Sequence, residues 1–198
     1  MQKGKMASFI WIVSVILLLW GLLTFLSQQK RGEKTFSFGP ISSNQKALII
    51  YNPDLFYDLD EQVCTSFAKG LIEKGWAAKV VTIAAAERLN EEPVDLYVFC
   101  ANTYNWAPDW PTSRFIKRQN NLENKNVIAI TLGSGSTNRA QRLLEHKLTQ
   151  KKVHLLDSQI FWLMRPNEEP STDKTNVGVA VENAYALEKK TAKRLSHE

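Results

Sequence analysis

The hydrophobic pattern divides this chain of 198 residues into two unlike parts. Residues 7–26 form an uninterrupted apolar stretch that contains no Asp, Glu, Lys, Arg or His. From about residue 46 onward, short apolar runs alternate with segments in which apolar residues recur at helical spacing. The first pattern is typical of a membrane-spanning helix and the second of a folded α/β domain. We therefore expect an N-terminal tail (residues 1–6), a transmembrane helix (7–26), a linker (27–45) and one domain (46–198).

The apolar stretch has the length of about 20 residues that a helix needs to cross a ~30 Å hydrocarbon core. A cleaved signal peptide is the alternative, but its apolar region is usually only ~7–15 residues long. Because Ser27-Gln28-Gln29 is also a poor cleavage site, we expect an uncleaved single-pass anchor in membrane lipid. Basic residues nearly balance across the helix, so charge does not fix its orientation. Cys64 and Cys100 form no disulfide framework, which favours a cytoplasmic soluble domain.

Five short apolar runs in the domain predict strands, which are Lys46–Tyr51, residues 78–83, 94–100 and 126–132, and a run that begins at 153–156. Apolar residues at helical spacing predict helices between and after them, at residues 58–74, 113–120, 137–151 and 176–195. Residues 84–90 are expected to form a short helix or a loop.

Short apolar strands that alternate with amphipathic helices predict a parallel sheet covered on both faces. With five strands, the doubly wound order 2-1-3-4-5 is favoured over a larger sheet. In such folds ligands bind beyond the carboxyl ends of the strands, where the strand order reverses. The loops to examine are therefore residues 52–59, 101–111 and 133–138.

The loop at residues 101–111 (ANTYNWAPDWP) contains Tyr104, Trp106 and Trp110 together with two prolines. Exposed rings on such a loop can stack on a flat heterocycle, because they supply contact area at a small entropic cost. The same rings also suit packing against the end of the sheet or contact with a membrane interface. Both interpretations stay open on the residues alone.

The other two loops differ in their suitability for an anion. Residues 133–138 (GSGSTN) offer glycines and a helix N-terminus that favour an approaching anion, or else an ordinary helix cap at Ser136 or Thr137. Residues 52–59 (NPDLFYDL) have no Gly, Ser or Thr to turn backbone amides onto a phosphate. Asp54 and Asp58 in that loop would repel one.

Charge and motifs exclude several other functions. The net charge is +5, but the basic residues are spread along the chain, so we expect no nucleic-acid partner. One basic cluster on the last predicted helix is expected to be solvated or to touch anionic lipid: Lys189, Lys190, Lys193 and Arg194. The three histidines lack metal-ligand spacing, the cysteines form no CxxC motif, and no G-x-S-x-G elbow is present.

Residues 46–195 resemble the flavodoxin-like family. The run KALIIY is similar to the family's first strand. Residues 94–116 (VDLYVFCANTYNWAPDWPTSRFI) are similar to its third strand, aromatic flavin loop and following helix. Residues 126–148 (NVIAITLGSGSTNRAQRLLEHKL) are similar to its fourth strand, glycine-containing loop and next helix, and residues 176–195 to its closing helix. The resemblance implies the flavodoxin-like doubly wound fold, which here follows the transmembrane helix that the apolar stretch predicts.

The resemblance also implies FMN as a cofactor and electron transfer or quinone-type reduction as the activity, with a redox or membrane protein as partner. The residues implied to contact the flavin lie after the third and fourth strands: Asn102, Thr103, Tyr104, Asn105, Trp106, Gly133, Ser134 and Gly135. Within this set, Tyr104 and Trp106 would flank the isoalloxazine ring, and the neighbouring polar side chains would contact its edge.

The chain departs from the family at the phosphate loop, where the family has Ser or Thr around a glycine and this chain has residues 52–59. Two hypotheses therefore remain. The first is a membrane-anchored FMN protein, acting as a redox carrier or an FMN-dependent oxidoreductase. The second is a flavin-free flavodoxin-like domain that serves as a membrane-tethered binding or assembly module.

Overall fold

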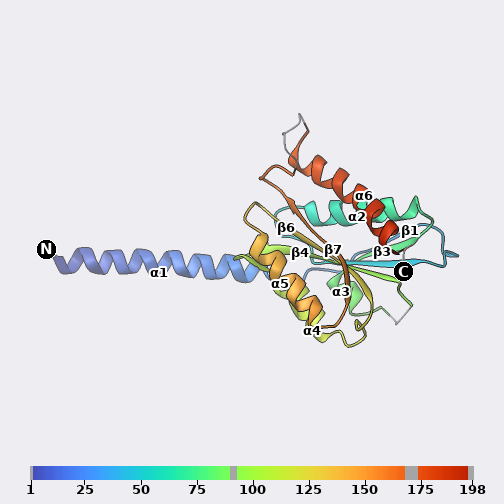
Figure 1. Ribbon diagram of the computed structural model, residues 1–198. Helices are drawn as coiled ribbons and strands as arrows, with labels where there is room; N and C mark the ends of the chain where they lie inside the picture. Colours follow the sequence, from blue (N-terminus) through green and yellow to red (C-terminus); the bar gives the residue numbers. More distant parts are fainter. Residues whose placement is uncertain (1, 90–92, 168–173, 196–198) are drawn as a thin grey trace.

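A long apolar helix projects from an α/β domain in the computed structural model, which describes residues 2–89, 93–167 and 174–195 (Figure 1). Helix α1 (Gln2–Ser27) contains the segment Met6–Ser27, which is long and apolar enough to cross a membrane. None of its apolar window is buried against the domain. The side chains of the basic cluster predicted on the last helix lie outside the described residues.

The central sheet has the order β1-β3-β2-β4-β6-β7. Its parallel strands are β2 (Lys46–Tyr51), β3 (Ala77–Thr82), β4 (Leu96–Tyr104), β6 (Asn126–Gly133) and β7 (His154–Trp162). Numbered along the chain, these five strands follow the order 2-1-3-4-5, which confirms the predicted doubly wound topology.

Two further strands extend the predicted sheet. Strand β1 (Thr35–Phe38) pairs antiparallel with β3 at the sheet edge, and β5 (Ala107–Pro108) forms a hairpin with β4. Strand β1 lies inside residues 27–45, which the sequence suggests as a linker. Its residues alternate between exposed and half-buried positions, so they form no continuous apolar run. This part of the expected linker is therefore a component of the sheet.

Helices cover both faces of the sheet (Figure 1). Helices α2 (Leu59–Ile72) and α6 (Asn176–Leu195) cover one face, and α3 (Ile83–Ala86), α4 (Trp110–Arg118) and α5 (Asn138–Thr149) cover the other. Neighbouring strand residues point to opposite faces. Ile49 accordingly lies in the core beneath α2 and α6, and Ile50 lies in the core on the other side.

Helix α4 begins three residues earlier than the expected helix at residues 113–120. The Asp109 side chain caps it, because its Oδ1 accepts the Thr112 backbone N–H at 2.9 Å. Pro111 stands in the first turn, where its missing N–H leaves no helical hydrogen bond unmade. The Asp-x-Pro sequence is therefore a helix start that the apolar spacing alone does not reveal.

Two glycines in turns beside β3 give a matched test of how closely the chain packs at this edge of the sheet. Gly39 (φ +80°) and Gly75 (φ +84°) are both left-handed, but only at Gly39 would a Cβ meet the Trp76 carbonyl oxygen at 2.3 Å. We expect Gly39→Ala to lower the free energy of unfolding by about 1–3 kcal/mol more than Gly75→Ala, because overpacking adds to a shared backbone strain. Urea unfolding of the full chain in detergent micelles, followed by tryptophan fluorescence, measures both. Equal losses would contradict this packing.

Candidate functional site

The carboxyl ends of the parallel strands form the edge at which α1 joins the domain (Figure 1). Near the end of α1, the Thr24 hydroxyl accepts a hydrogen bond from Asn105 Nδ2 at 3.2 Å. Just after α1, Gln28 Oε1 accepts the Trp110 backbone N–H at 2.7 Å. The apolar helix and the loops expected to bind a ligand therefore share one edge of the sheet.

The first loop, between β2 and α2, is closed by its own carboxylates. Asp54 Oδ1 accepts the backbone N–H groups of Phe56 at 2.7 Å and Tyr57 at 3.3 Å. Asp60 Oδ2 accepts the Asp54 N–H at 2.6 Å, and Asp60 Oδ1 accepts the Glu61 N–H at 2.7 Å. Four amides at the entry to α2 thus donate to side chains of this loop and of the first turn of α2, in the place where an anion would need them.

Asn102 joins this loop to the rest of the edge. Its side-chain amide donates to Asp60 Oδ2 at 2.8 Å and to the Asn52 carbonyl at 2.9 Å. Its backbone N–H donates to Asp109 Oδ2 at 3.0 Å. Asn102 is buried, and its side-chain amide joins residues in the interior of the edge.

The two acids bound by Asn102 are almost completely enclosed. Asp60 is 2% exposed and Asp109 is fully buried. Burial raises the pKa of Asp60 to about 6, although the hydrogen bond from Asn102 opposes the shift. Burial likewise raises the pKa of Asp109 to about 7, against the opposing hydrogen bonds from Thr112 and Asn102. The edge therefore holds two carboxyl groups that titrate near neutral pH.

The segment directly after α1 lies on this edge and is part of it. Ser27 and Gln28 are buried. The Asn52 side chain donates to the Gln29 carbonyl and accepts the Arg31 backbone N–H, both at 3.1 Å. Gln29 and Arg31 are therefore bonded to the first loop, and this part of the expected linker is not free.

The hairpin between β4 and β5 separates Tyr104 from Trp106. The Tyr104 hydroxyl donates to the Asp54 carboxylate, and burial raises the pKa of Tyr104 above its usual range. Trp106 is 52% exposed at the tip. Asn105 (φ +50°) and Trp106 (φ +58°) are both left-handed, as a two-residue type I′ turn requires. Glycine usually takes the second position, and a side chain there costs about 1–2 kcal/mol.

The third loop uses its glycine for internal packing. A Cβ on Gly133 would lie 2.5 Å from Thr137 Cγ2 and 3.1 Å from Thr103 Cβ. The Ser134 carbonyl accepts two backbone N–H groups from the segment after β7, each at 3.2 Å, and the Gly135 carbonyl accepts the Thr137 N–H at 3.0 Å. One polar atom beside this loop, Thr103 Oγ1, is buried and has no hydrogen-bond partner among the described residues.

A cavity of about 410 Å³ lies between the hairpin and α1. Its lining includes Trp20, Leu23 and Thr24 from the helix and Tyr104 and Asn105 from the hairpin. Trp106 and the glycine loop do not line it. The two loops that the flavin resemblance pairs therefore do not enclose this cavity.

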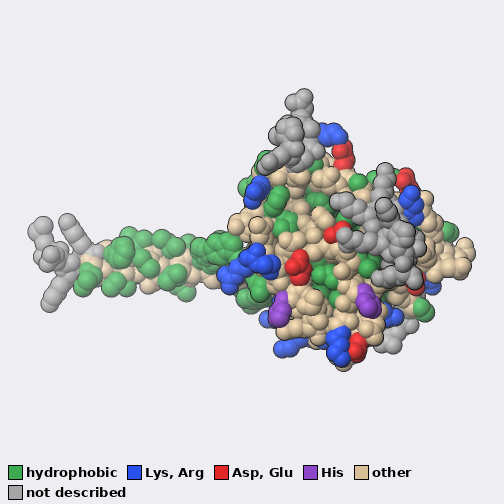
Figure 2. Space-filling view, viewed as in Figure 1, with side chains coloured by type: hydrophobic (Ala, Val, Ile, Leu, Met, Phe, Trp, Pro, Cys, Tyr) green, Lys and Arg blue, Asp and Glu red, His purple; other side chains and the backbone are tan. Residues whose placement is uncertain are grey.

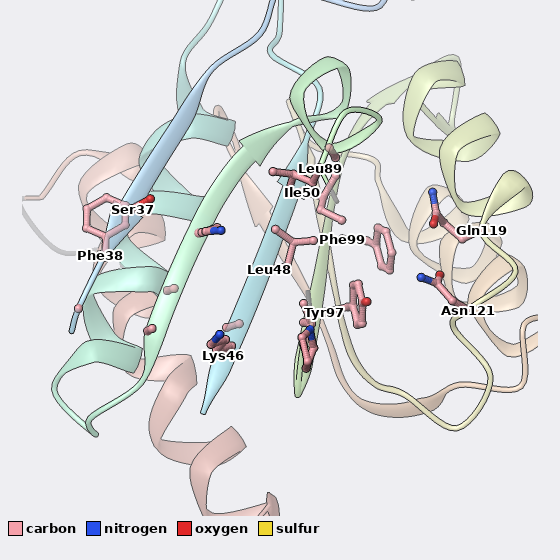
Figure 3. A pocket seen from close by; sticks show the side chains of 18 of the residues that line it. Ser37, Phe38, Lys46, Leu48, Ile50, Leu89, Tyr97, Phe99, Gln119 and Asn121 are labelled. Carbon is pink, nitrogen blue, oxygen red and sulfur yellow. The ribbon is translucent and has the colours of Figure 1, made fainter. Parts of the chain in front are cut away.

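A larger cavity of about 560 Å³ opens on the sheet face that α3 and α4 cover (Figure 3). Leu48, Tyr97 and Phe99 form its floor, with Lys46 at one end of β2. The face is incompletely covered because α3 has only four residues. Residues 90–92, in the connection to β4, lie outside the described residues.

The residues at the carboxyl edge do not fit the phosphate of FMN. A phosphate needs free amides or cations, whereas the first-loop amides are bonded to Asp54 and Asp60. The sequence indicates that the composition of the first loop is unsuited to phosphate. It does not reveal the roles of Asp60, Asp109 and Gln28 at this edge. Asp109 carries a local signal as a helix cap, while the burial of Asp60 and Gln28 depends on contacts with Asn102 and Trp110 that are distant in sequence.

No protein-family model and no curated protein matches this sequence. Solved structures do match. A flavodoxin from the domain Archaea aligns with a TM-score of 0.55 and 13% identity, over 74% of this chain and 98% of that chain. A short-chain flavodoxin associated with a non-canonical PDU bacterial microcompartment aligns with a TM-score of 0.55 and 14% identity, over 76% and 98%.

The flavodiiron protein from Giardia intestinalis aligns with a TM-score of 0.58 and 14% identity, over 76% of this chain and 37% of that chain. At such identities a structural likeness establishes the fold and leaves function to the site. Together with the strand order, these likenesses establish that this chain has a flavodoxin-like fold, with an apolar helix joined to the carboxyl edge of its sheet.

Proposed function

We propose that this chain is a membrane-anchored, flavodoxin-like domain that works without FMN, as a tethered binding or assembly module. The observation that carries the proposal is the closure of the first loop by Asp54 and Asp60, which accept four backbone amides. A phosphate entering this loop would have to displace charge-assisted hydrogen bonds, which are among the stronger kinds. It would also approach two carboxyl groups, whose ionised forms repel it.

The segment after α1 supports the same function. Residues 28–31 are bonded to Asn52 and to the start of α4, on the edge where a flavin ring would enter. An anchor that occupies this edge holds the domain permanently at the membrane surface. A freely diffusing electron carrier, by contrast, needs its cofactor edge open to partners.

Electron transfer with FMN is the second candidate function, and two observations favour it. Trp106 offers an exposed ring, and the buried Thr103 hydroxyl beside Gly133 has no partner in the part of the chain that the structure describes, in the region where the edge of a flavin would lie. In this candidate the eight residues that the resemblance assigns would contact the ring, and a redox protein would be the partner.

The anchor itself is part of the proposal. Met6–Ser27 would span the membrane once. A cytoplasmic position of the domain is supported by Cys64 and Cys100, which are both free and buried, as a reducing compartment allows.

Flavin titration distinguishes the two functions. We expect the full chain in detergent micelles to purify colourless and to bind FMN no more tightly than riboflavin, because no phosphate site is available. Quenching of flavin fluorescence measures both affinities. A preference for FMN of tenfold or more, equivalent to about 1.4 kcal/mol, would reject the flavin-free function.

Two serine variants serve as matched comparisons in this titration. Asp54→Ser removes a charge and also frees the Phe56 and Tyr57 amides. Asp58→Ser removes a charge from the same loop but frees no backbone amide of the loop. If the amides are the missing element, Asp54→Ser alone should gain a preference for FMN over riboflavin.

The buried acids predict an unusual dependence of stability on pH. Asp60 and Asp109 have folded-state pKa values of about 6 and about 7, above the ordinary value of 3.8. Between pH 3.8 and these raised values, the folded chain therefore holds more protons than the unfolded chain. Their stabilising contribution is complete below about pH 4 and is lost as the pH rises through 6 to 7, with a slope of at most about 1.4 kcal/mol per pH unit for each carboxyl.

We therefore expect the free energy of unfolding, measured by urea titration, to fall from about pH 5 to about pH 8. Asp109→Asn should flatten this slope, whatever it does to stability at a single pH through the lost helix cap. Asp58→Asn, which changes an exposed acid of the same edge, is the control. A slope that is unchanged by Asp109→Asn would show that this carboxyl does not titrate near neutral pH.

Alkaline carbonate extraction tests the anchor. The full chain reconstituted in liposomes should remain with the lipid at high pH, because one helix of about 20 apolar residues is held by hydrophobic transfer and not by charge. Release into the supernatant would contradict a membrane-spanning α1.

A further inference from the structure

We propose that the carboxyl edge of the sheet docks onto the surface of the same bilayer that α1 spans, with its exposed aromatic and apolar side chains in the interfacial region. The docking rim consists of Leu55, Phe56, Tyr57, Trp106, Trp110 and Met164. The inference rests on the proposed membrane anchor, and it assigns the edge a lipid surface as its ligand.

The distribution of exposed apolar side chains is the first support. Outside α1, eight large apolar residues of the described chain are exposed, and six of them are the docking rim. The six come from the loops that follow β2, β4 and β7 and from Trp110 at the start of α4, all at the carboxyl edge. The other two, Ile41 and Leu89, line the larger cavity on the sheet face. Such a concentration marks an interaction surface, whereas single exposed apolar residues are ordinary.

The level of the hairpin along α1 is the second support. Asn105, next to Trp106, bonds Thr24, which lies three residues or about 4.5 Å before the end of the helix. The same hairpin shares a cavity with Trp20 and Leu23 of the helix. If the helix crosses the membrane, the tip of the hairpin is therefore level with its last apolar turns. Trp106 then lies at the depth where tryptophan collects in membrane proteins.

The backbone of Trp106 is the third support. An exposed tryptophan occupies the left-handed position that a type I′ turn normally gives to glycine. Folding alone would favour glycine there. A strained residue that the fold does not need points to a role for its side chain. At this position the role is insertion of the Trp106 ring, as an aromatic wedge, into the interfacial region of the bilayer.

The charges at the edge suit a lipid surface. The Arg114 guanidinium lies 5.7 Å above the centre of the Trp110 ring, and that of Arg165 lies 4.7 Å above the Trp162 ring. Lys and Arg side chains gather where the apolar helix meets the domain (Figure 2). Of the acids of the first loop, Asp54 and Asp60 are turned to backbone amides, leaving Asp58 exposed. Aromatic rings flanked by arginine match the interface between headgroups and acyl chains.

Site-specific probes in liposomes test the docking. Phe56→Cys and Trp106→Cys place a thiol on the rim, and Ile41→Cys is the control because Ile41 is 97% exposed and lies away from it. The native cysteines are buried and do not compete for an environment-sensitive label. We expect the two rim probes to emit at shorter wavelength than the control and to be quenched severalfold more by lipids carrying a nitroxide. Rim probes as wet and as unquenched as the control would overturn the docking.

Flotation of the same liposomes separates this inference from the anchor. Protein that floats with the vesicles but carries wet rim probes refutes the docking alone. Protein that fails to float refutes the anchor on which the docking rests. Dry rim probes that nitroxide lipids do not quench would mean that another protein, and not lipid, covers the edge, and would also refute the docking.

Trp106→Gly provides an independent readout. Glycine relieves the left-handed strain, so the urea midpoint of unfolding should stay constant or rise. The probe at position 56 should nevertheless lose at least half of its quenching by nitroxide lipids, because the wedge is gone. A purely structural role for Trp106 predicts the reverse, with a lower midpoint and unchanged quenching.

Discussion

The amide of Asn102 is the contact on which the carboxyl edge depends. From the end of β4 it binds Asp60 and Asn52 of the first loop, while its own backbone N–H binds the cap of α4. Because Asn52 in turn binds the chain that follows α1, one residue connects the central strand, two helix starts and the base of the apolar helix. A buried network of this kind has little tolerance for a missing partner, since each orphaned group would keep its full desolvation penalty.

Under the proposed function, the same network explains how a flavodoxin-like fold can persist without a bound phosphate. Parallel strands that end beside a helix N-terminus leave backbone amides that need acceptors. A bound anion supplies them in a phosphate-binding loop, and here the carboxyl groups of Asp54 and Asp60 supply them instead. On this proposal the geometry of the fold is retained, and the chain supplies the hydrogen-bond acceptors that a bound phosphate would otherwise supply.

The periodicity of apolar residues predicted the five parallel strands, their order and both helical layers, because burial on the sheet faces dictates those positions. It missed β1, whose four residues lie on an edge with one side open to water, and it placed the start of α4 three residues late. The candidate site was less predictable. Composition identified the first loop as unsuited to phosphate, but the roles of Asp60 and Gln28 depend on pairing with residues 42 and 82 positions away.

The direct attachment of α1 to the carboxyl edge has a geometric consequence for any partner. Because the helix is bonded directly to the carboxyl edge, a helix that crosses a bilayer holds the strands with their carboxyl ends toward the membrane and both sheet faces roughly perpendicular to the membrane plane. The cavity beneath α3 and α4 opens on one of those faces (Figure 3). Molecules that are themselves confined to the membrane would meet this opening by lateral diffusion in two dimensions, at a fixed height above the lipid, whereas molecules arriving from solution would have to approach from the side.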